Sequence, residues 1–354
     1  MRQVWPKLTA IQYMTLTVDV TNCCNQCRNQ TVALPRTLLL LCLSLPTLRD
    51  ISVVTGRNSV DHMSGTLSLA TCASLVRLEL WNCKNVGDLS KLQQLRILEI
   101  EQCSVAENWT TSLGELKSLE RLELARIEEP FELPISFGRL TELQYFRISG
   151  CKVTSIPASF RKLTSLQVLE VERIIGRQVI PIRRFRRLRS LKMTCWAIAD
   201  LADVFRELIA LEEFHCEGIS ELPATLENLT LLKKLWVKCH VKVLPDSLGN
   251  LTNLEVENCP IQSLPETLGQ LSSLRRLKVS FCRNLKTLPD SIGDLSSLES
   301  LGLSGSALHS LPDTIKNLSQ LETLHICYCK NLKTVPDWIG DLTSLRHFTF
   351  SYIS

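Results

Sequence analysis

The chain carries one seventeen-residue stretch twice, as CRNLKTLPDSIGDLSSL at residues 282–298 and as CKNLKTVPDWIGDLTSL at residues 329–345. The two copies differ at four positions and begin 47 residues apart. Internal similarity at a fixed spacing indicates a repeat architecture. The same pattern of leucine, cysteine and proline positions extends through most of the 354 residues.

The repeating unit reads L-x-x-L-x-L-x-x-C/N, then a variable turn, then L-P-x-x-I/L/F-x-x-L. Thirteen of these units can be placed, and they begin at Leu75, Leu95, Leu119, Leu143, Leu166, Leu188, Leu211, Leu232, Leu251, Leu274, Leu298, Leu321 and Leu345. The first and last starts are 270 residues apart, so the twelve intervals have a mean of 22.5 residues. This period is typical of leucine-rich repeats, whose units are about 20–29 residues long.

The first half of the unit predicts a strand. In LRRLKVSFC (274–282), Leu277 and Val279 alternate with polar residues, which indicates one buried and one exposed face. Successive strands are expected to stack as a parallel sheet, because a single repeat cannot bury its leucines without its neighbours.

The second half of the unit predicts a short helical or 3-10 turn, because a proline that fixes φ suits the start of such a turn. The prolines in this place are Pro134, Pro157, Pro223, Pro245, Pro265, Pro289, Pro312 and Pro336. Strands stack more closely than helical turns. We therefore expect an α/β repeat solenoid, a leucine-rich-repeat horseshoe with a concave parallel sheet and convex short helical or 3-10 turns.

The expected domain division falls at residue 75. Residues 75–354 form a leucine-rich-repeat domain without a C-terminal cap, so Phe348, Phe350 and Tyr352 of its last strand are expected to be exposed. Residues 1–74 hold degenerate N-terminal repeats or a cap, with echoes of the unit in ALPRTLLLL (33–41) and LRDISVVTG (48–56).

Six repeats carry cysteine at the ninth position, where the chain turns inward after the strand: Cys83, Cys103, Cys151, Cys259, Cys282 and Cys329. A small, buriable side chain with a weak donor fits backbone groups that lack ladder partners there. We interpret these cysteines as structural thiols in a reducing compartment. Cys23, Cys24 and Cys27 lack the second ligand pair of a structural zinc site, so no metal is expected.

No phosphate-binding loop, kinase, hydrolase or zinc-protease motif is present, which predicts a protein that is not an enzyme and needs no cofactor. The chain is 45% hydrophobic and 21% charged with a net charge of +4, so it is globular, and its charge does not favour nucleic acid. The run LLLLCLSL (38–45) is too short to span a membrane, and no secretory signal is evident. We expect a cytoplasmic protein, with the nucleus as the alternative.

The variable strand positions are the expected binding surface, because curved solenoid sheets offer extended surfaces and aromatic residues dominate interface hot spots. The candidate residues for a protein partner on the concave face are Trp81, Glu99, Glu101, Glu123, Tyr145, Glu170, Glu172, Trp236 and Lys238. No small-molecule substrate is expected. A second candidate is the basic run Arg183, Arg184, Arg186, Arg187 and Arg189. It is either a solvated convex turn, a site for an acidic or phosphorylated partner, or a nuclear-import signal.

The phrase LPDSIGDLSSLESLGLSG (288–305) resembles the leucine-rich-repeat region of plant nucleotide-binding disease-resistance proteins. It is also similar to plant intracellular Ras-group-related leucine-rich-repeat proteins. Extracellular plant receptor kinases carry glycine two residues before I-P, whereas this chain has Ser263 before Leu264 and Pro265.

The resemblance implies a non-enzymatic protein-binding module that acts in recognition or signalling in plant innate immunity. Two alternatives stay open. One is a stand-alone intracellular scaffold for small-GTPase signalling. The other is the substrate-recognition arm of a ubiquitin-ligase or phosphatase complex.

Overall fold

The computed structural model of the chain describes residues 13–18, 48–55, 72–107, 109–174, 180–194, 201–238, 240–246, 248 and 250–351. The chain forms two compact units that divide after Phe185. The echo expected at 33–41, the cysteines at 23, 24 and 27, and Tyr352 lie outside the described residues. Within the described ranges, every helix is too short or too polar to cross a lipid bilayer.

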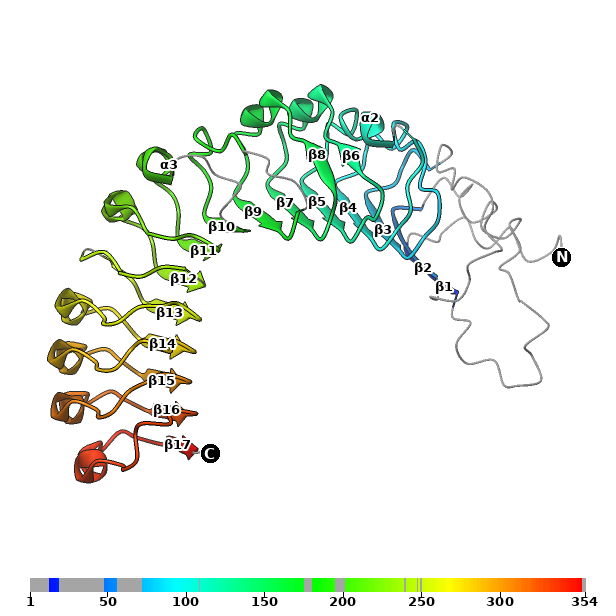
Figure 1. The fold of residues 1–354 in the computed structure, drawn as a ribbon. Helices are drawn as coiled ribbons and strands as arrows, with labels where there is room; N and C mark the ends of the chain where they lie inside the picture. Colours follow the sequence, from blue (N-terminus) through cyan, green and yellow to red (C-terminus); the bar gives the residue numbers. More distant parts are fainter. Residues whose placement is uncertain are drawn as a thin grey trace, which may run out of the picture. The chain divides into compact units, whose positions relative to one another are not determined.

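The first unit is built on parallel strands that follow one another in chain order (Figure 1). The described strands of this sheet are β1 (Tyr13–Val18), β2 (Asp50–Thr55), β3 (Arg77–Trp81), β4 (Ile97–Glu101), β5 (Arg121–Ala125), β7 (Tyr145–Ser149) and β9 (Val168–Glu172). The opposite side carries the short strands β6 (Phe131–Glu132) and β8 (Val153–Ser155), which pair with each other, and the turns α2 (Trp109–Leu113), η2 (Ile135–Arg139) and η3 (Ala158–Lys162).

The second unit has the same arrangement, and no strand pair like β6 and β8 is assigned to its described residues. Its parallel strands are β10 (Ser190–Thr194), β11 (Glu213–Glu217), β12 (Lys234–Lys238), β13 (Asn253–Glu257), β14 (Arg276–Ser280), β15 (Ser300–Ser304), β16 (Thr323–Cys327) and β17 (His347–Ser351). Its helical elements lie on the far side of the leucine core from the strands: α3 (Leu201–Glu207), η5 (Ala224–Asn228), η6 (Glu266–Gln270), η7 (Asp290–Asp294), η8 (Asp313–Asn317) and η9 (Asp337–Asp341).

The register of the strands confirms the predicted repeat. Each strand from β3 onward, apart from the added β6 and β8, begins two residues after one of the thirteen leucines. Leu277 opposes Leu254 on one side and Leu301 on the other, and all three side chains are buried. The prediction of a leucine-rich-repeat solenoid with a parallel sheet and short 3-10 turns is therefore confirmed. The strand β2 lies within the stretch 48–56, but the assignment of residues 1–74 to degenerate repeats or a cap and the domain division at residue 75 both stay predictions.

The prolines act one residue earlier than expected. Seven of the eight stand immediately before a 3-10 turn, with φ from −62° at Pro336 to −74° at Pro134, whereas no such turn is assigned to the described residues after Pro245. The carbonyl of each of the seven accepts the first hydrogen bond of the turn, as at Pro289, whose oxygen lies 3.1 Å from the amide nitrogen of Ile292. The apolar residue of the turn then packs into the core, and Ile292 is fully buried.

The ninth-position cysteines are buried free thiols, as predicted. Each donates weakly to a backbone carbonyl of the preceding repeat, as in Cys151 Sγ to the oxygen of Leu124 at 3.5 Å and Cys103 Sγ to Leu80 at 3.4 Å. Burial raises the pKa of the Cys151 and Cys282 thiols, which keeps them protonated and unreactive.

Candidate functional site

The candidate residues other than the arginine run lie on the strand face of their own unit. We define it as the side chains at the third, fifth and seventh positions of each repeat, which point away from the leucines. Along β3, β4, β5, β7 and β9 these side chains are half-buried, and the residues between them are fully buried. The alternation arises because the side-chain period of a strand is two residues.

In the first unit the strand face is crowded with carboxylates. Parallel register places Glu79, Glu99 and Glu123 opposite one another on adjacent strands, about 4.8 Å apart along the sheet. Arg77 and Arg121 are shared between them, at 3.6 and 3.5 Å from the same oxygen of Glu99. Burial, then the charges of Glu123 and Glu79, raise the pKa of Glu99 above its ordinary value despite these arginines.

Tyr145 is an aromatic side chain of this surface that contacts residues of both neighbouring strands. The guanidinium carbon of Arg121 lies 3.7 Å from the centre of its ring, a cation–π contact. Its hydroxyl donates to Glu170 Oε1 at 3.3 Å, and Arg147 lies 3.5 Å from the other oxygen of Glu170. Burial, with the charges of Glu170 and Glu123, raises the pKa of Tyr145 to about 12, so the hydroxyl is a donor at neutral pH.

The other candidates of the first unit end their strands. Trp81 closes β3 and is half-buried. Glu101 closes β4 and pairs with Arg126 at 3.2 Å, and Glu172 closes β9. The structure therefore brings Trp81, Tyr145 and the predicted glutamates onto one face of one unit.

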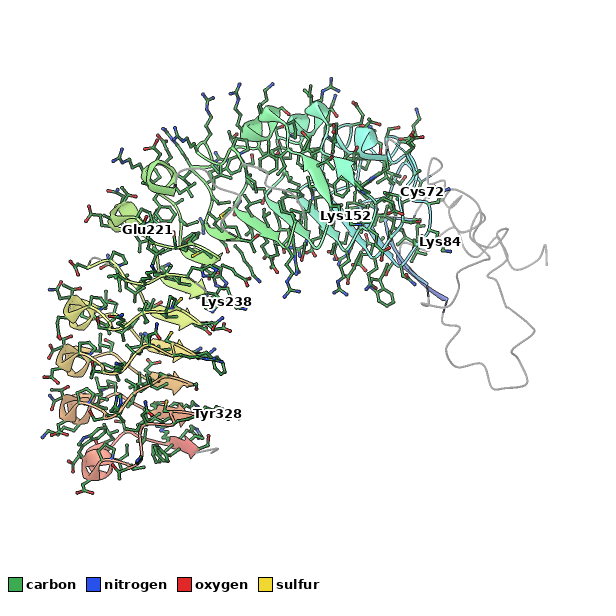
Figure 2. All side chains as sticks on the ribbon, viewed as in Figure 1. Cys72, Lys84, Lys152, Glu221, Lys238 and Tyr328 are labelled. Carbon is green, nitrogen blue, oxygen red and sulfur yellow. The ribbon has the colours of Figure 1, made fainter. Side chains whose placement is uncertain are left out.

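Trp236 and Lys238 belong to the second unit. The ring of Trp236 lies 5.5 Å from that of His215 on the neighbouring strand, and Lys238 Nζ lies 5.9 Å from its centre. Figure 2 shows Lys238 on the strand side of β12. Trp236 also borders an open hollow of about 540 Å³, which reaches across β13 and β14 to His325 and Cys327. Ser300, Gly302 and Ser304 also line this hollow, and their side chains are small or absent.

The arginines of the run are exposed, and the apolar residues among them pack into the core and hold the segment in place. Ile182, Phe185 and Leu188 are fully buried. The five arginines of the run are exposed: Arg183, Arg184, Arg186, Arg187 and Arg189. Arg186 pairs with Glu207 at 3.1 Å and Arg189 with Glu212 at 3.5 Å. These contacts are consistent with a solvated turn, and its role in binding stays a prediction.

One recurring feature of the repeats was missed from the sequence. The eighth residue, between strand and cysteine, has a left-handed backbone in every repeat for which the structure describes it, as at Asn82 (φ 55°) and Gly218 (φ 90°). Its amide donates to the last carbonyl of the next strand, for example Asn82 to Glu101 at 2.9 Å. Recurring asparagine and glycine at this position were the available signal, because both adopt this conformation readily.

Comparisons with known proteins agree with this geometry. A family model described as a leucine-rich repeat region matches residues 47–201 and 266–354. Among solved structures, a leucine-rich-repeat protein of Leptospira interrogans has a TM-score of 0.61 at 21% identity, covering 91% of this chain and 85% of its own. An internalin of Listeria monocytogenes has a TM-score of 0.56 at 18% identity, covering 88% and 83%. At these identities the likeness concerns the fold alone.

Two curated proteins of Arabidopsis thaliana are similar in sequence. Protein SUPPRESSOR OF npr1-1, CONSTITUTIVE 1 is 27% identical over 222 residues, which are 61% of this chain and 14% of that protein. A putative disease resistance protein is 26% identical over 289 residues, which are 71% of this chain and 24% of that protein. The chain thus spans a quarter or less of each relative. Because the family match covers more than two thirds of its 354 residues, the chain belongs to the leucine-rich repeat region family.

Proposed function

We propose that this chain is a non-enzymatic recognition module of the plant disease-resistance type and that it binds a protein partner on its strand face. The observation that carries the proposal is the setting of Tyr145. Its ring is fixed by Arg121 and Glu170 while part of it stays accessible, which is how a preorganised interface anchor is built.

The surrounding charges support a protein rather than a small molecule as the partner. The strand face of the first unit is broad, and its ion pairs join neighbouring strands instead of converging on one cavity. Such surfaces suit an extended interface, in which a few aromatic residues supply affinity and charges supply orientation.

The role in plant innate immunity comes from the relatives, one of which is named a putative disease resistance protein. A cytoplasmic or nuclear location belongs to the same proposal. It is supported by the free thiols among the described cysteines, because disulfides are rare in reducing compartments. The two alternative functions predict different partners. A scaffold for small-GTPase signalling would capture a small GTPase, and a substrate-recognition arm would capture components of a ubiquitin-ligase or phosphatase complex.

Affinity capture from plant extract with mass spectrometry, followed by binding measurements with the captured protein, tests the proposal. Trp81→Ala, Tyr145→Ala and Trp236→Ala should each weaken binding about thirtyfold where the ring is an anchor, because lost hot-spot aromatics cost about 2 kcal/mol or more. Substituting the five arginines between 183 and 189 is the matched control. Binding that survives all three alanine variants but fails with the arginine variant would refute the strand-face site.

A further inference from the structure

Two eighth-position residues of the second unit differ in kind from the others described. They are Phe281 and Tyr328, with φ of 55° and 57°. Bulky side chains are disfavoured in the left-handed region, whereas glycine and asparagine enter it readily. A strained backbone geometry that is occupied by a poorly suited residue type points to a function for the side chain.

The fold does not need an aromatic ring at this position. The corner hydrogen bond is made by the backbone, from Phe281 to Ser304 at 2.6 Å and from Tyr328 to Ser351 at 3.1 Å. Gly305, in the repeat between them, makes the same bond to Cys327 at 2.8 Å. Phe281 and Tyr328 are 47% and 48% exposed, so neither ring is buried in the core.

Each ring begins the same short motif, FCRNLK at 281–286 and YCKNLK at 328–333. In each motif the leucine is buried and the asparagine side chain donates to the preceding repeat, Asn284 to Pro260 at 3.4 Å and Asn331 to Ala307 at 3.2 Å. The two motifs are thereby fixed to the scaffold. We call their exposed aromatic and basic residues the aromatic-basic edge: Phe281, Arg283, Lys286, Tyr328, Lys330 and Lys333.

The cations of this edge are not neutralised within the described part of the chain. Arg283, Lys286, Lys330 and Lys333 form no ion pair there, whereas on the strand face of the same unit Lys238 pairs with Glu217 and Lys278 with Glu255. Figure 2 shows Tyr328 at the end of β16, where this edge lies. The edge therefore presents two exposed rings flanked by four uncompensated positive charges.

The repeat between the two motifs has glycine, Gly305, at its eighth position and therefore no side chain there. A Cβ atom on Gly305 would come within 2.6 Å of Phe281 Cδ1, so the phenyl ring leans over this glycine towards the second motif. The two rings directly follow strands β14 and β16, which are two strand spacings, or about 10 Å, apart. A peptide in the polyproline II conformation has three residues per turn and rises about 3.1 Å per residue, so its residues i and i+3 lie on the same side and span about the same distance.

We propose that the aromatic-basic edge binds an acidic segment of a partner protein in the polyproline II conformation, with apolar side chains at i and i+3 against Phe281 and Tyr328 and carboxylates against the four cations. Single-stranded nucleic acid fits the spacing less well, because its bases stack on aromatic side chains in immediate succession. The site is separate from the strand face and does not depend on the function proposed for that face.

Fluorescence anisotropy with the full chain tests this site. The probes are a labelled short peptide rich in Glu with Leu at i and i+3, its Gln-for-Glu analogue, and labelled oligothymidylate. The Glu peptide should bind, the Gln analogue should bind more weakly, and added salt should weaken the Glu peptide. The double variant Phe281→Asn, Tyr328→Asn should lose about tenfold or more in affinity, since each ring acts as an anchor. Lys330→Gln with Lys333→Gln should also weaken binding.

Lys152→Gln is the matched control, because Lys152 follows Cys151 as Lys330 follows Cys329 but has glycine in place of the ring. It should leave binding unchanged, and thermal melting should show that all variants are folded. Three results would each overturn the proposal: no binding of the Glu peptide, full binding by the double asparagine variant, or tighter binding of oligothymidylate than of the Glu peptide. Trp236→Ala should have no effect on the peptide, which separates this site from the strand face.

Discussion

Glu99 shows how register creates electrostatic conflict at a single residue. Because the strands are parallel and in register, glutamates at the fifth position of three repeats stand side by side. Arg77 and Arg121 offset part of the repulsion but do not remove it, since the pKa of Glu99 is still raised. The cause is burial first, then the neighbouring carboxylates. Such a residue is held in place by the fold at some cost to stability.

Glu99→Gln is therefore expected to raise the free energy of unfolding at neutral pH. A carboxyl whose pKa is raised in the folded state favours folding while it is protonated, and that contribution is lost as pH rises through the folded-state pKa. The wild type should approach the variant at pH values below 4.5, the ordinary pKa of a glutamate side chain. Urea unfolding of both proteins at acid and neutral pH measures the difference. A variant that is less stable at neutral pH would mean that the arginine contacts outweigh the repulsion.

The rings of Phe281 and Tyr328 supply a second test at the residue scale. Asparagine tolerates the left-handed region better than an aromatic residue does, by an amount on the order of 1 kcal/mol. Replacing either ring by asparagine should leave the free energy of unfolding unchanged or slightly raised. Denaturant unfolding checks this, and a loss of several kcal/mol would show that the rings are structural.

At the scale of elements, some of the 3-10 turns pack against the next repeat through a glycine, and Gly138, Gly269 and Gly293 are such residues. A Cβ atom on Gly293 would lie 2.4 Å from the carbonyl oxygen of Thr314, and one on Gly269 would lie 2.5 Å from that of Ser291. Both partners are backbone atoms of the following turn and cannot yield cheaply. Gly340 occupies the same place in the second copy of the repeated stretch, yet a Cβ atom added there would meet nothing within 4 Å among the described residues.

This pair gives a matched experiment. Gly293→Ala should destabilise the protein by about 1–3 kcal/mol, as expected for overpacking against a neighbour. Gly340→Ala should be neutral or stabilising by up to about 1 kcal/mol, because alanine loses less backbone entropy on folding. Neither glycine has a positive φ, so the comparison isolates stacking. Equal effects in the two thermal melts would contradict this account of the turn stack.

The elements also show what the sequence could and could not predict. The alternation in LRRLKVSFC and its equivalents placed every strand from β3 to β17 apart from the added pair, because a period of two next to a fixed leucine leaves one register that buries the apolar side chains. The added strands β6 and β8 were missed, since Phe131 and Glu132 are too few to show a period. The left-handed corner was missed because asparagine, glutamine, arginine and aromatic residues all occupy it.

For the whole molecule, a net charge of +4 conceals local excesses of both signs. From β2 to β9 the strand face carries seven carboxylates, with Asp50 the first, against three arginines, whereas the aromatic-basic edge of the second unit is positive. The glutamates could be named from the sequence, because repeat position alone decides which side chains face out. Their pairing could not, since it depends on the rotamers of Arg77, Arg121 and Arg147.

The excess of carboxylates predicts how a strand-face partner would associate. Reversing Glu99, Glu101, Glu170 and Glu172 to lysine should mainly slow association of the captured partner, because complementary charges at an interface steer encounter more than they hold the complex. Glu99, Glu101 and Glu170 pair with arginines in the folded chain, so a moderate loss of stability is expected and must be measured alongside.

Surface plasmon resonance at low and high salt separates the two effects. The difference in association rate between wild type and variant should shrink at high salt, where the screening length falls to about 3 Å at 1 M. The dissociation rate should change far less than it does in Tyr145→Ala, which removes an anchor. If the reversal instead speeds association, the partner is acidic. The arginine run or the aromatic-basic edge would then be the better site for that partner, because each presents exposed positive charge.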